Sequence, residues 1–512
     1  CQSHQTRTMT SVSRVHGCVY AAAILGIIVF MLVLLHTNTG ARNHMIKYKA
    51  AGLQRIKSLG RNLIVSLNKS QALNGGLMKI NDDQIKKSIE NVPQSSAIPY
   101  VVNVRHSFEL VEGLKSHLYI YSALWNVKNV RLESIKVKGY VFQNLQCVFY
   151  YTLDNSKPDL YVKSEIKQRN ANGLQYVIAH ITCPITKNEF KGKIPMFVGF
   201  VENALDKPRQ LFPVEHLSQS KEVTHEFTEC VPAMHEWANA ALLVEKIEMG
   251  RLFGAGRIVL YDTSISPSVD AVLRMYAREW AEGRETLEVV VLPWKLPKES
   301  GEQIPIHYWA QELAMDDCLY RYKRLSKYIV FDDLDEFLVP FKHDNWSALV
   351  EERQKLNPKS IGWLFRSSVF SKNIPSVALG YEQDYLRYRS SILGLTMRDE
   401  YIYPKDIRPK LIVNPGVVEE MGVHLISKGT GSTDILPVDV GLLFHYRKEP
   451  NCCRRIKDTR LVYKYGDRLV ARLKEIWSKL PGVGLGWSPL SKINCTIHQK
   501  PDKKKIKQCS RL

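Results

Sequence analysis

The stretch YIVFDDLDEFLVP at residues 328–340 decides the fold, because it runs from an apolar strand into a cluster of acids. Asp332, Asp333, Asp335 and Glu336 crowd there, and carboxylates so close repel one another unless a cation or solvent neutralises them. On an extended chain alternate residues point the same way, so Asp333 and Asp335 are expected to address one ion. Hard oxygen ligands suit Mg²⁺ or Mn²⁺. The stretch therefore predicts a metal site, with a solvated acidic strand end as the alternative.

Strands and helices alternate in the region before the acids. The pattern predicts strands at 227–232, 258–264 and 287–294, and helices at 236–253, 267–282 and 307–324. Such alternation indicates a parallel sheet covered by helices. Ligands of such sheets bind beyond the carboxyl ends of the strands, which is where the acids lie. We therefore expect an α/β domain at 221–500.

Residues 101–220 have a different texture, with short β-branched and aromatic runs such as HLYIYSALW and QYVIAHITC. Several such runs predict a small all-β, sandwich-like domain. Cys147 and Cys183 each lie in one of the runs, so a disulfide between them is expected.

The N-terminal part predicts a membrane anchor. No residue from 17 to 35 is charged, and the apolar run at 19–35 is long enough for a thin bilayer. We expect an uncleaved signal anchor after a cytosolic tail at 1–18, and then a stem at 36–100. Met9 is the first expected start, so residues 1–8 are expected to lie outside the native chain. A basic tail is expected at 501–512.

Cysteines and glycosylation sequons favour a lumenal body. Eight cysteines follow the anchor, and N-x-S/T sequons occur at Asn68, Asn345 and Asn494. The formal net charge of +20 favours anionic partners such as nucleotide phosphates. No nucleic-acid-binding motif accompanies the charge, so we expect no nucleic-acid partner. The sequence does not indicate an oligomeric state.

The segment IHYWAQELAMDDCLYRYKRLSKYIVFDDLDEFLVP resembles the core of glycosyltransferase family 92. That family carries a Q-x-x-x-x-x-D-C-L helix and a strand that ends in D-x-D-E-F. The matching positions are Gln311, Asp317, Cys318, Leu319, Asp333, Asp335, Glu336 and Phe337. The resemblance covers roughly residues 100–450, and Asp332 is an acid beyond the family pattern.

The resemblance implies a GT-A fold in a single-pass type II Golgi membrane enzyme. The implied reaction is inverting transfer of galactose from UDP-galactose, with Mn²⁺ or Mg²⁺, to a β-galactoside or fucose of a glycoprotein glycan. It implies metal ligation by Asp333 and Asp335. It also implies that Gln311 and Asp317 lie in the donor-binding part of the fold.

Further candidate residues have both a functional and a structural interpretation. Asp262 ends the second strand and is expected at the uridine or ribose, although an Asx turn is an equal alternative. A late histidine commonly completes such metal sites, but a lone histidine is more often structural. The remaining candidates are His424 and His445 as metal ligands, Lys410 and Arg447 at the diphosphate, and Glu400 or Asp406 as weak candidates for the base.

Two rival functions remain open from the sequence. An aspartyl-nucleophile phosphatase also places D-x-D after an apolar strand, but its motif normally opens the domain. A non-catalytic sugar-binding membrane protein would need neither Asp333 nor Asp335.

Overall fold

The computed structural model describes eight stretches of the chain, which are residues 101–102, 107–152, 157–169, 172–186, 193–203, 206–216, 223–447 and 454–486. The predicted tail at 1–18, anchor at 19–35, stem at 36–100 and basic tail at 501–512 lie outside them. Among the described residues, no helix is both long and apolar enough to span a membrane.

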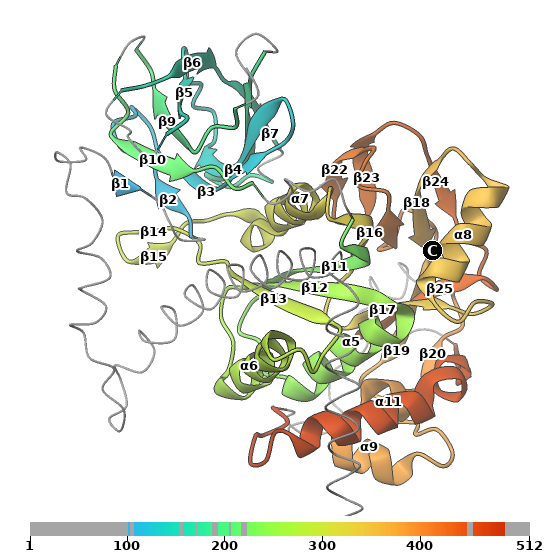
Figure 1. Cartoon of the computed structure of the whole chain (residues 1–512). Helices are drawn as coiled ribbons and strands as arrows, with labels where there is room; N and C mark the ends of the chain where they lie inside the picture. Colours follow the sequence, from blue (N-terminus) through green and yellow to red (C-terminus); the bar gives the residue numbers. More distant parts are fainter. Residues whose placement is uncertain are drawn as a thin grey trace, which may run out of the picture. The chain divides into compact units, whose positions relative to one another are not determined.

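The alternating region and three strands that follow the acids form a seven-stranded mixed sheet (Figure 1). Its order is β13-β12-β11-β16-β21-β18-β24, and β13, β12, β11 and β16 run parallel. β21 pairs antiparallel with both β16 and β18. The bounds are β11 His225–Met234, β12 Ala255–Asp262, β13 Glu288–Pro293, β16 Ser326–Phe331, β18 Ser360–Phe365, β21 Lys410–Val413 and β24 Ser432–Ile435. The predicted parallel strands are confirmed, and the acids directly follow β16.

Helices cover both faces of this sheet. In Figure 1, α7 lies on one side, and α5 and α6 lie on the other. The bounds are α5 Ala240–Phe253, α6 Pro267–Ala281, η2 His307–Ala310, α7 Gln311–Tyr322, α8 Trp346–Leu356, α9 Glu382–Tyr388, α10 Ser391–Gly394 and α11 Arg460–Ser478. The predicted start of α6 at Pro267 is confirmed, and the Ser266 side chain caps the helix.

Two predicted helices begin later than expected. α5 starts at Ala240 because the Asn239 side chain accepts a hydrogen bond from the Leu242 amide and sets the cap there. α7 starts at Gln311 because the preceding Tyr308, Trp309 and Ala310 have left-handed backbone angles. Residues with positive φ cannot continue a right-handed helix.

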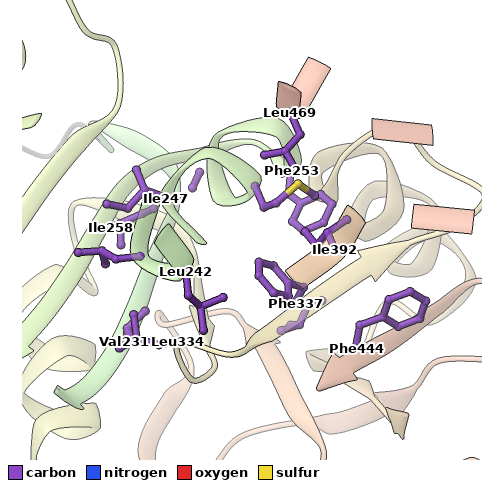
Figure 2. Close-up of a cluster of buried hydrophobic side chains, with 14 of the residues drawn as sticks. Val231, Leu242, Ile247, Phe253, Ile258, Leu334, Phe337, Ile392, Phe444 and Leu469 are labelled. Carbon is purple, nitrogen blue, oxygen red and sulfur yellow. The ribbon is translucent and has the colours of Figure 1, made fainter. Parts of the chain in front are cut away.

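The main hydrophobic core lies between the sheet and α5, which is buried on nearly every side (Figure 2). Leu242 and Ile247 of α5 belong to one buried cluster with Val231 of β11 and Leu469 of α11. Leu334, which lies among the acids, is only 6% exposed and joins the same cluster. The core therefore holds the acidic segment in place through its one apolar residue.

A second, five-stranded sheet begins where the acids end. Its order is β17-β25-β19-β20-β26. The bounds are β17 Glu336–Pro340, β19 Ser367–Ser371, β20 Met397–Asp399, β25 Gly441–Arg447 and β26 Arg455–Lys457. β17 and β25 are antiparallel, and their register sets Glu336 opposite His445. This pairing brings a histidine more than a hundred residues away in sequence to the acids.

The β-rich region, residues 101–216, contains two five-stranded sheets that share a buried cluster. Their orders are β1-β10-β9-β5-β6 and β2-β3-β4-β8-β7. The bounds are β1 Val101–Val102, β2 Glu109–Leu110, β3 Leu118–Trp125, β4 Asn129–Val137, β5 Gln146–Tyr150, β6 Leu160–Lys163, β7 Glu165–Gln168, β8 Tyr176–Pro184, β9 Phe197–Val201 and β10 Gln210–Pro213. The predicted Cys147–Cys183 disulfide is confirmed and joins β5 to β8. The predicted domain boundary near residue 220 stays a prediction.

Two short hairpins complete the described elements. They are β14 Lys298–Glu299 with β15 Glu302–Gln303, and β22 Val418–Gly422 with β23 Leu425–Gly429.

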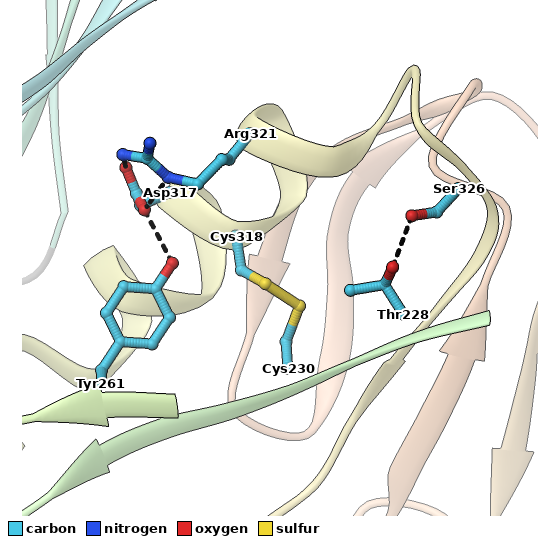
Figure 3. The surroundings of a disulfide bond; sticks show 7 residues. All are labelled: Thr228, Cys230, Tyr261, Asp317, Cys318, Arg321 and Ser326. Atoms are coloured by element: carbon cyan, nitrogen blue, oxygen red, sulfur yellow. Dashed lines mark hydrogen bonds and ion pairs between the residues drawn. A yellow bond between two sulfur atoms is a disulfide. The ribbon is translucent and has the colours of Figure 1, made fainter. Parts of the chain in front are cut away.

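Helix α7 joins the β-rich region to the seven-stranded sheet. Figure 3 shows its contacts to the sheet. The buried Asp317 carboxylate accepts hydrogen bonds from Ser122 Oγ at 2.6 Å and Tyr261 Oη at 2.7 Å, and it pairs with Arg321. A second disulfide, Cys230–Cys318, which the sequence did not indicate, ties α7 to β11. The described residues, from Val101 onward, accordingly belong to one compact unit.

One buried carboxylate predicts a pH dependence of stability. Glu245 of α5 accepts hydrogen bonds from Ser390 Oγ and from the amides of Ser391 and Ile392. Burial raises its pKa from 4.5 to about 7, although these hydrogen bonds oppose the rise. The folded chain therefore holds an extra proton, so stability falls as pH increases through this window. The expected loss is about 1.4 kcal/mol per pH unit, ~3 kcal/mol in all.

Urea unfolding between pH 4.5 and 7.5 tests this expectation. Glu245→Gln removes the titration, so its stability should depend less on pH than that of the unsubstituted chain. Equal slopes for the two proteins would show that Glu245 ionises normally.

Candidate active site

The acid turn, residues 332–335, crosses from β16 to β17. The Glu336 amide donates to the Asp333 carbonyl at 3.1 Å, and the Asp333 amide donates to Glu336 Oε2 at 3.1 Å. The segment is a turn, so the expectation that an extended strand aligns Asp333 with Asp335 is wrong. Both side chains nevertheless stay accessible, at 36% for Asp333 and 26% for Asp335.

Three side chains from other elements hold these two carboxylates. Lys410 Nζ lies 2.9 Å from Asp333 Oδ2, and Gln311 Nε2 donates to Asp333 Oδ1 at 3.1 Å. Lys372 Nζ lies 3.1 Å from Asp335 Oδ2. Although burial opposes ionisation, the Lys410 ammonium lowers the pKa of Asp333. The structure thus brings Gln311 and Lys410 to the acids and adds Lys372, which sequence reasoning missed.

The two candidate histidines have different partners, the acids for His445 and a backbone carbonyl for His424. His445 Nε2 is 3.6 Å from Asp335 Oδ1, and His445 Nδ1 is 3.2 Å from Glu336 Oε1. Burial lowers the pKa of His445 to about 4, and the charge of Arg447 acts in the same direction. His424 Nδ1 contacts the Pro409 carbonyl at 3.1 Å. Burial and then the charge of Lys410 lower its pKa, so both imidazoles are neutral near pH 7.

The residues of the acid turn fit a divalent cation in their chemistry. Within the described part of the chain, no three or more His, Cys, Asp or Glu side chains are grouped as a metal-holding set in the arrangement shown. Asp333 and Asp335 still offer accessible carboxylate oxygens, and neutral His445 offers a nitrogen lone pair, which metal ligation requires. The lysines now pair with these oxygens, as a cation would. The donor set of Asp333, Asp335 and His445 therefore suits Mn²⁺ or Mg²⁺.

Asp332 has a different environment from its neighbours, because it is buried in an ion cluster. Lys246 of α5 places its Nζ 2.5 Å from Asp332 Oδ2, 2.7 Å from Glu229 Oε1 and 2.8 Å from the Glu336 carbonyl. Burial raises the pKa of Asp332 well above its usual value, although Lys246 opposes this. We call Glu229, Lys246 and Asp332 the buried clamp. Lys246 thus contacts Asp332, at the start of the acid turn, and the Glu336 carbonyl, just after its end. This contact gives Asp332, the acid beyond the family pattern, a structural role.

The carboxyl ends of β11, β12 and β13 form the neighbouring edge of the site. Asp262 ends β12, and its Oδ2 lies 3.2 Å from Lys295 Nζ. His235, just after β11, stacks on Trp309 with ring centroids 4.2 Å apart. The structure thus places Asp262 at the ligand-binding edge that the topology predicts. His235 and Trp309 were missed, since a single histidine and tryptophan give no periodic signal.

Three predicted site residues lie apart from the acid turn. Asp317 is fully buried, and Ser122, Tyr261 and Arg321 take its oxygens, so the expectation that it contacts a donor is corrected. Among the described residues, neither Glu400 nor Asp406 has a hydrogen bond or ion pair to the acid turn. Glu400 pairs with Arg454 at 3.4 Å, and Asp406 is exposed in the loop before β21. Arg447 ends β25, two residues after His445.

Comparison with known proteins gives a consistent family. The sequence model of glycosyltransferase family 92 matches residues 225–478. Beta-1,4-galactosyltransferase galt-1 of Caenorhabditis elegans is 23% identical over 366 residues, which cover 70% of this chain and 80% of that protein. Galactan beta-1,4-galactosyltransferase GALS3 of Arabidopsis thaliana is 30% identical over 224 residues, 42% of this chain and 40% of that protein.

A third relative carries the family in its own name. Glycosyltransferase family 92 protein F13G3.3 of Caenorhabditis elegans is 28% identical over 123 residues, 23% of this chain and 22% of that protein. The matched region spans the seven-stranded sheet, the acid turn and the second sheet, and it ends with α11. Through residues 225–478, this chain belongs to glycosyltransferase family 92.

Proposed function

We propose that this family 92 glycosyltransferase transfers galactose from UDP-galactose, with inversion, to a β-galactoside or fucose of a glycoprotein glycan. The observation that carries the proposal is the acid turn. Asp333 and Asp335 remain accessible at the carboxyl end of β16, where Gln311, Lys410 and His445 converge on them. The galactosyltransferase names of the nematode and plant relatives support the choice of sugar.

The chain's own residues divide the work of binding and of charge compensation. Asp333, Asp335 and His445 would hold Mn²⁺ or Mg²⁺. When bound, such an ion acts as a Lewis acid that stabilises the departing diphosphate. Lys410, Lys372 and Arg447 surround these ligands with positive charge, which favours the phosphates. Asp262, at the end of β12, is the proposed contact to the uridine.

An inverting transfer also needs a base at the acceptor hydroxyl. Glu400 and Asp406 remain the candidates for this base. Either carboxylate would have to lie within hydrogen-bond reach of the hydroxyl that attacks the donor.

A donor screen tests the proposed reaction. Purified protein is incubated with UDP-galactose, UDP-glucose or UDP-N-acetylglucosamine, with Mn²⁺ or with a chelator, and release of UDP is measured. We expect UDP-galactose to be hydrolysed fastest and the chelator to abolish turnover. Faster turnover of another donor would overturn the sugar assignment, and metal-independent turnover would overturn the role of the acid turn.

We further propose a Golgi location, with the described residues in the lumen. The two disulfides suit an oxidising compartment, and the apolar run at 19–35 supplies the anchor. Glycosidase treatment of protein made in cells should increase its gel mobility. Of the sequons, Asn345 should contribute least, because its side chain caps α8. Protease sensitivity of the body in sealed microsomes would contradict this topology.

A further inference from the structure

Three consecutive residues before α7 hold an unusual backbone. Tyr308, Trp309 and Ala310 have φ angles of 43°, 51° and 59°, although none is glycine. L-residues rarely adopt this conformation, and it persists only where the surroundings enforce it. Such strain is concentrated at functional sites, so the segment is a candidate for a functional role.

Contacts to Trp309 enforce the strained turn. The buried Trp294 donates its indole N–H to the Trp309 carbonyl at 2.8 Å. The Trp309 ring stacks on His235, with an angle of 25° between the planes. With Trp309 fixed on both sides and Ala310 fully buried, Tyr308 is left 63% exposed. The strained turn therefore leaves the Tyr308 ring exposed to solvent.

The exposed ring borders a small pocket between the β-rich region and α7. We call it the aromatic pocket, and its lining residues are Tyr176, Val177, Ile178, Ile306, His307, Tyr308, Gln311, Glu312 and Val423. Gln311 also donates to Asp333 at 3.1 Å. Gln311 therefore lines the pocket and also contacts the acid turn. A ligand at the pocket would lie beside the proposed site of transfer.

The chemistry of the lining favours a neutral, hydroxyl-rich ligand. Its nine residues include no lysine or arginine. The neighbouring Arg169 guanidinium pairs with Glu312 at 3.2 Å and with Asp316, so its charge is already compensated and attracts a diphosphate only weakly. His307 and Tyr308 are exposed and offer rings on which an apolar sugar face packs, whereas Tyr176 is only 1% exposed. Gln311 and Glu312 add polar groups to the lining. The lining thus differs in charge from the lysine-rich surroundings of Asp333 and Asp335.

The Glu299 carboxylate holds the pocket residue Tyr176 in place. Tyr176 donates its hydroxyl to Glu299 Oε1, which also accepts from Tyr119 Oη at 2.9 Å and contacts His117 Nδ1 at 2.6 Å. Because β3 and β8 carry these tyrosines and β14 carries Glu299, the pocket wall is preorganised by the contact between two parts of the fold.

We propose that the exposed Tyr308 ring, at the mouth of the aromatic pocket, is the packing face for a neutral sugar ring of the acceptor glycan. The identification of this sugar as the acceptor rests on the proposed transferase function, whereas sugar binding at Tyr308 does not depend on it.

Tyr308→Ala tests the proposal, with Tyr463→Ala as the matched control. Tyr463 lies on α11 and is equally exposed, at 63%. Tyr308→Trp keeps a packing face. Binding of lactose and of methyl α-L-fucoside is measured by saturation-transfer NMR without donor, and acceptor and donor KM values are measured with UDP-galactose and Mn²⁺. Melting temperatures establish that each variant is folded.

We expect Tyr308→Ala to lose the NMR signal and to raise the acceptor KM at least tenfold, while the donor KM changes less than twofold. Tyr463→Ala should match the unsubstituted protein, and Tyr308→Trp should retain binding. Sugar binding that is unaffected in Tyr308→Ala, absent from the unsubstituted protein, or equally reduced in Tyr463→Ala would overturn the pocket. Tyr308-dependent sugar binding without UDP-galactose turnover would instead leave the pocket standing and refute the proposed function.

Discussion

Asp333→Ala and Asp335→Ala are each expected to lower the rate of galactose transfer by at least about a hundredfold. Each substitution would remove a ligand from the proposed cation, which would stabilise the leaving diphosphate when bound. Electrostatic stabilisation of this kind is worth several kcal/mol, and each ~1.4 kcal/mol is tenfold in rate. The measurement is transfer rate against Mn²⁺ concentration for purified variants.

Both variants should remain folded, because neither change strands a buried cation. Lys410 keeps Glu336 Oε2 at 3.3 Å when Asp333 is removed, and Lys372 is partly exposed. Asp439→Ala is the matched control, since Asp439 is an exposed carboxylate paired with Lys342. Its rate should be unchanged. Near-native rates in folded Asp333→Ala and Asp335→Ala would make the acid turn a solvated strand end.

Lys246→Met is expected to have the largest effect on stability, a loss of about 3–5 kcal/mol. The substitution removes the only cation of the buried clamp and leaves Glu229 and Asp332 buried together. Both side chains are at most 1% exposed, so water cannot replace the lost charge. Urea unfolding at pH 7 measures the effect, provided that the variant is soluble.

Two further variants separate the clamp from an ordinary ion pair. Lys342→Met breaks an exposed pair and should cost less than about 1 kcal/mol. Combining Lys246→Met with Glu229→Gln and Asp332→Asn removes the unpaired acids and should recover part of the lost stability. A cost below about 1 kcal/mol for Lys246→Met would show that the clamp does not hold the turn. Asp332→Ala is also expected to destabilise the fold, because it removes one of the two carboxylates that pair with Lys246.

The alternation of strands and helices, and with it a parallel sheet, could be predicted because local signals mark each element. Apolar runs, helix caps and Pro267 mark each unit, and parallel topology then places the acids at one edge. The position of His445 could not be predicted to the same degree. It depends on the pairing of β17 with β25, a long-range contact that no local pattern specifies.

Other features depend on partners that the sequence does not name. Lys372 and Lys246 look like ordinary surface lysines until the fold sets them against Asp335 and Asp332. The late start of α7 was hidden because its left-handed residues include no glycine. Asp317 shows the reverse case, since a motif position near a site was interpreted as part of it, whereas its oxygens serve the packing of α7.

The network around Asp317 also limits how such enzymes can be recombined. Ser122 and Glu215 of the β-rich region reach into α7 through Asp317 and Arg321, and the same helix presents Gln311 to the acid turn. The β-rich region therefore cannot be exchanged between related proteins independently of α7. A chimaera in which only this region is replaced would leave Asp317 and Arg321 without Ser122 and Glu215. Both residues lie on α7, the helix whose Gln311 contacts the acid turn.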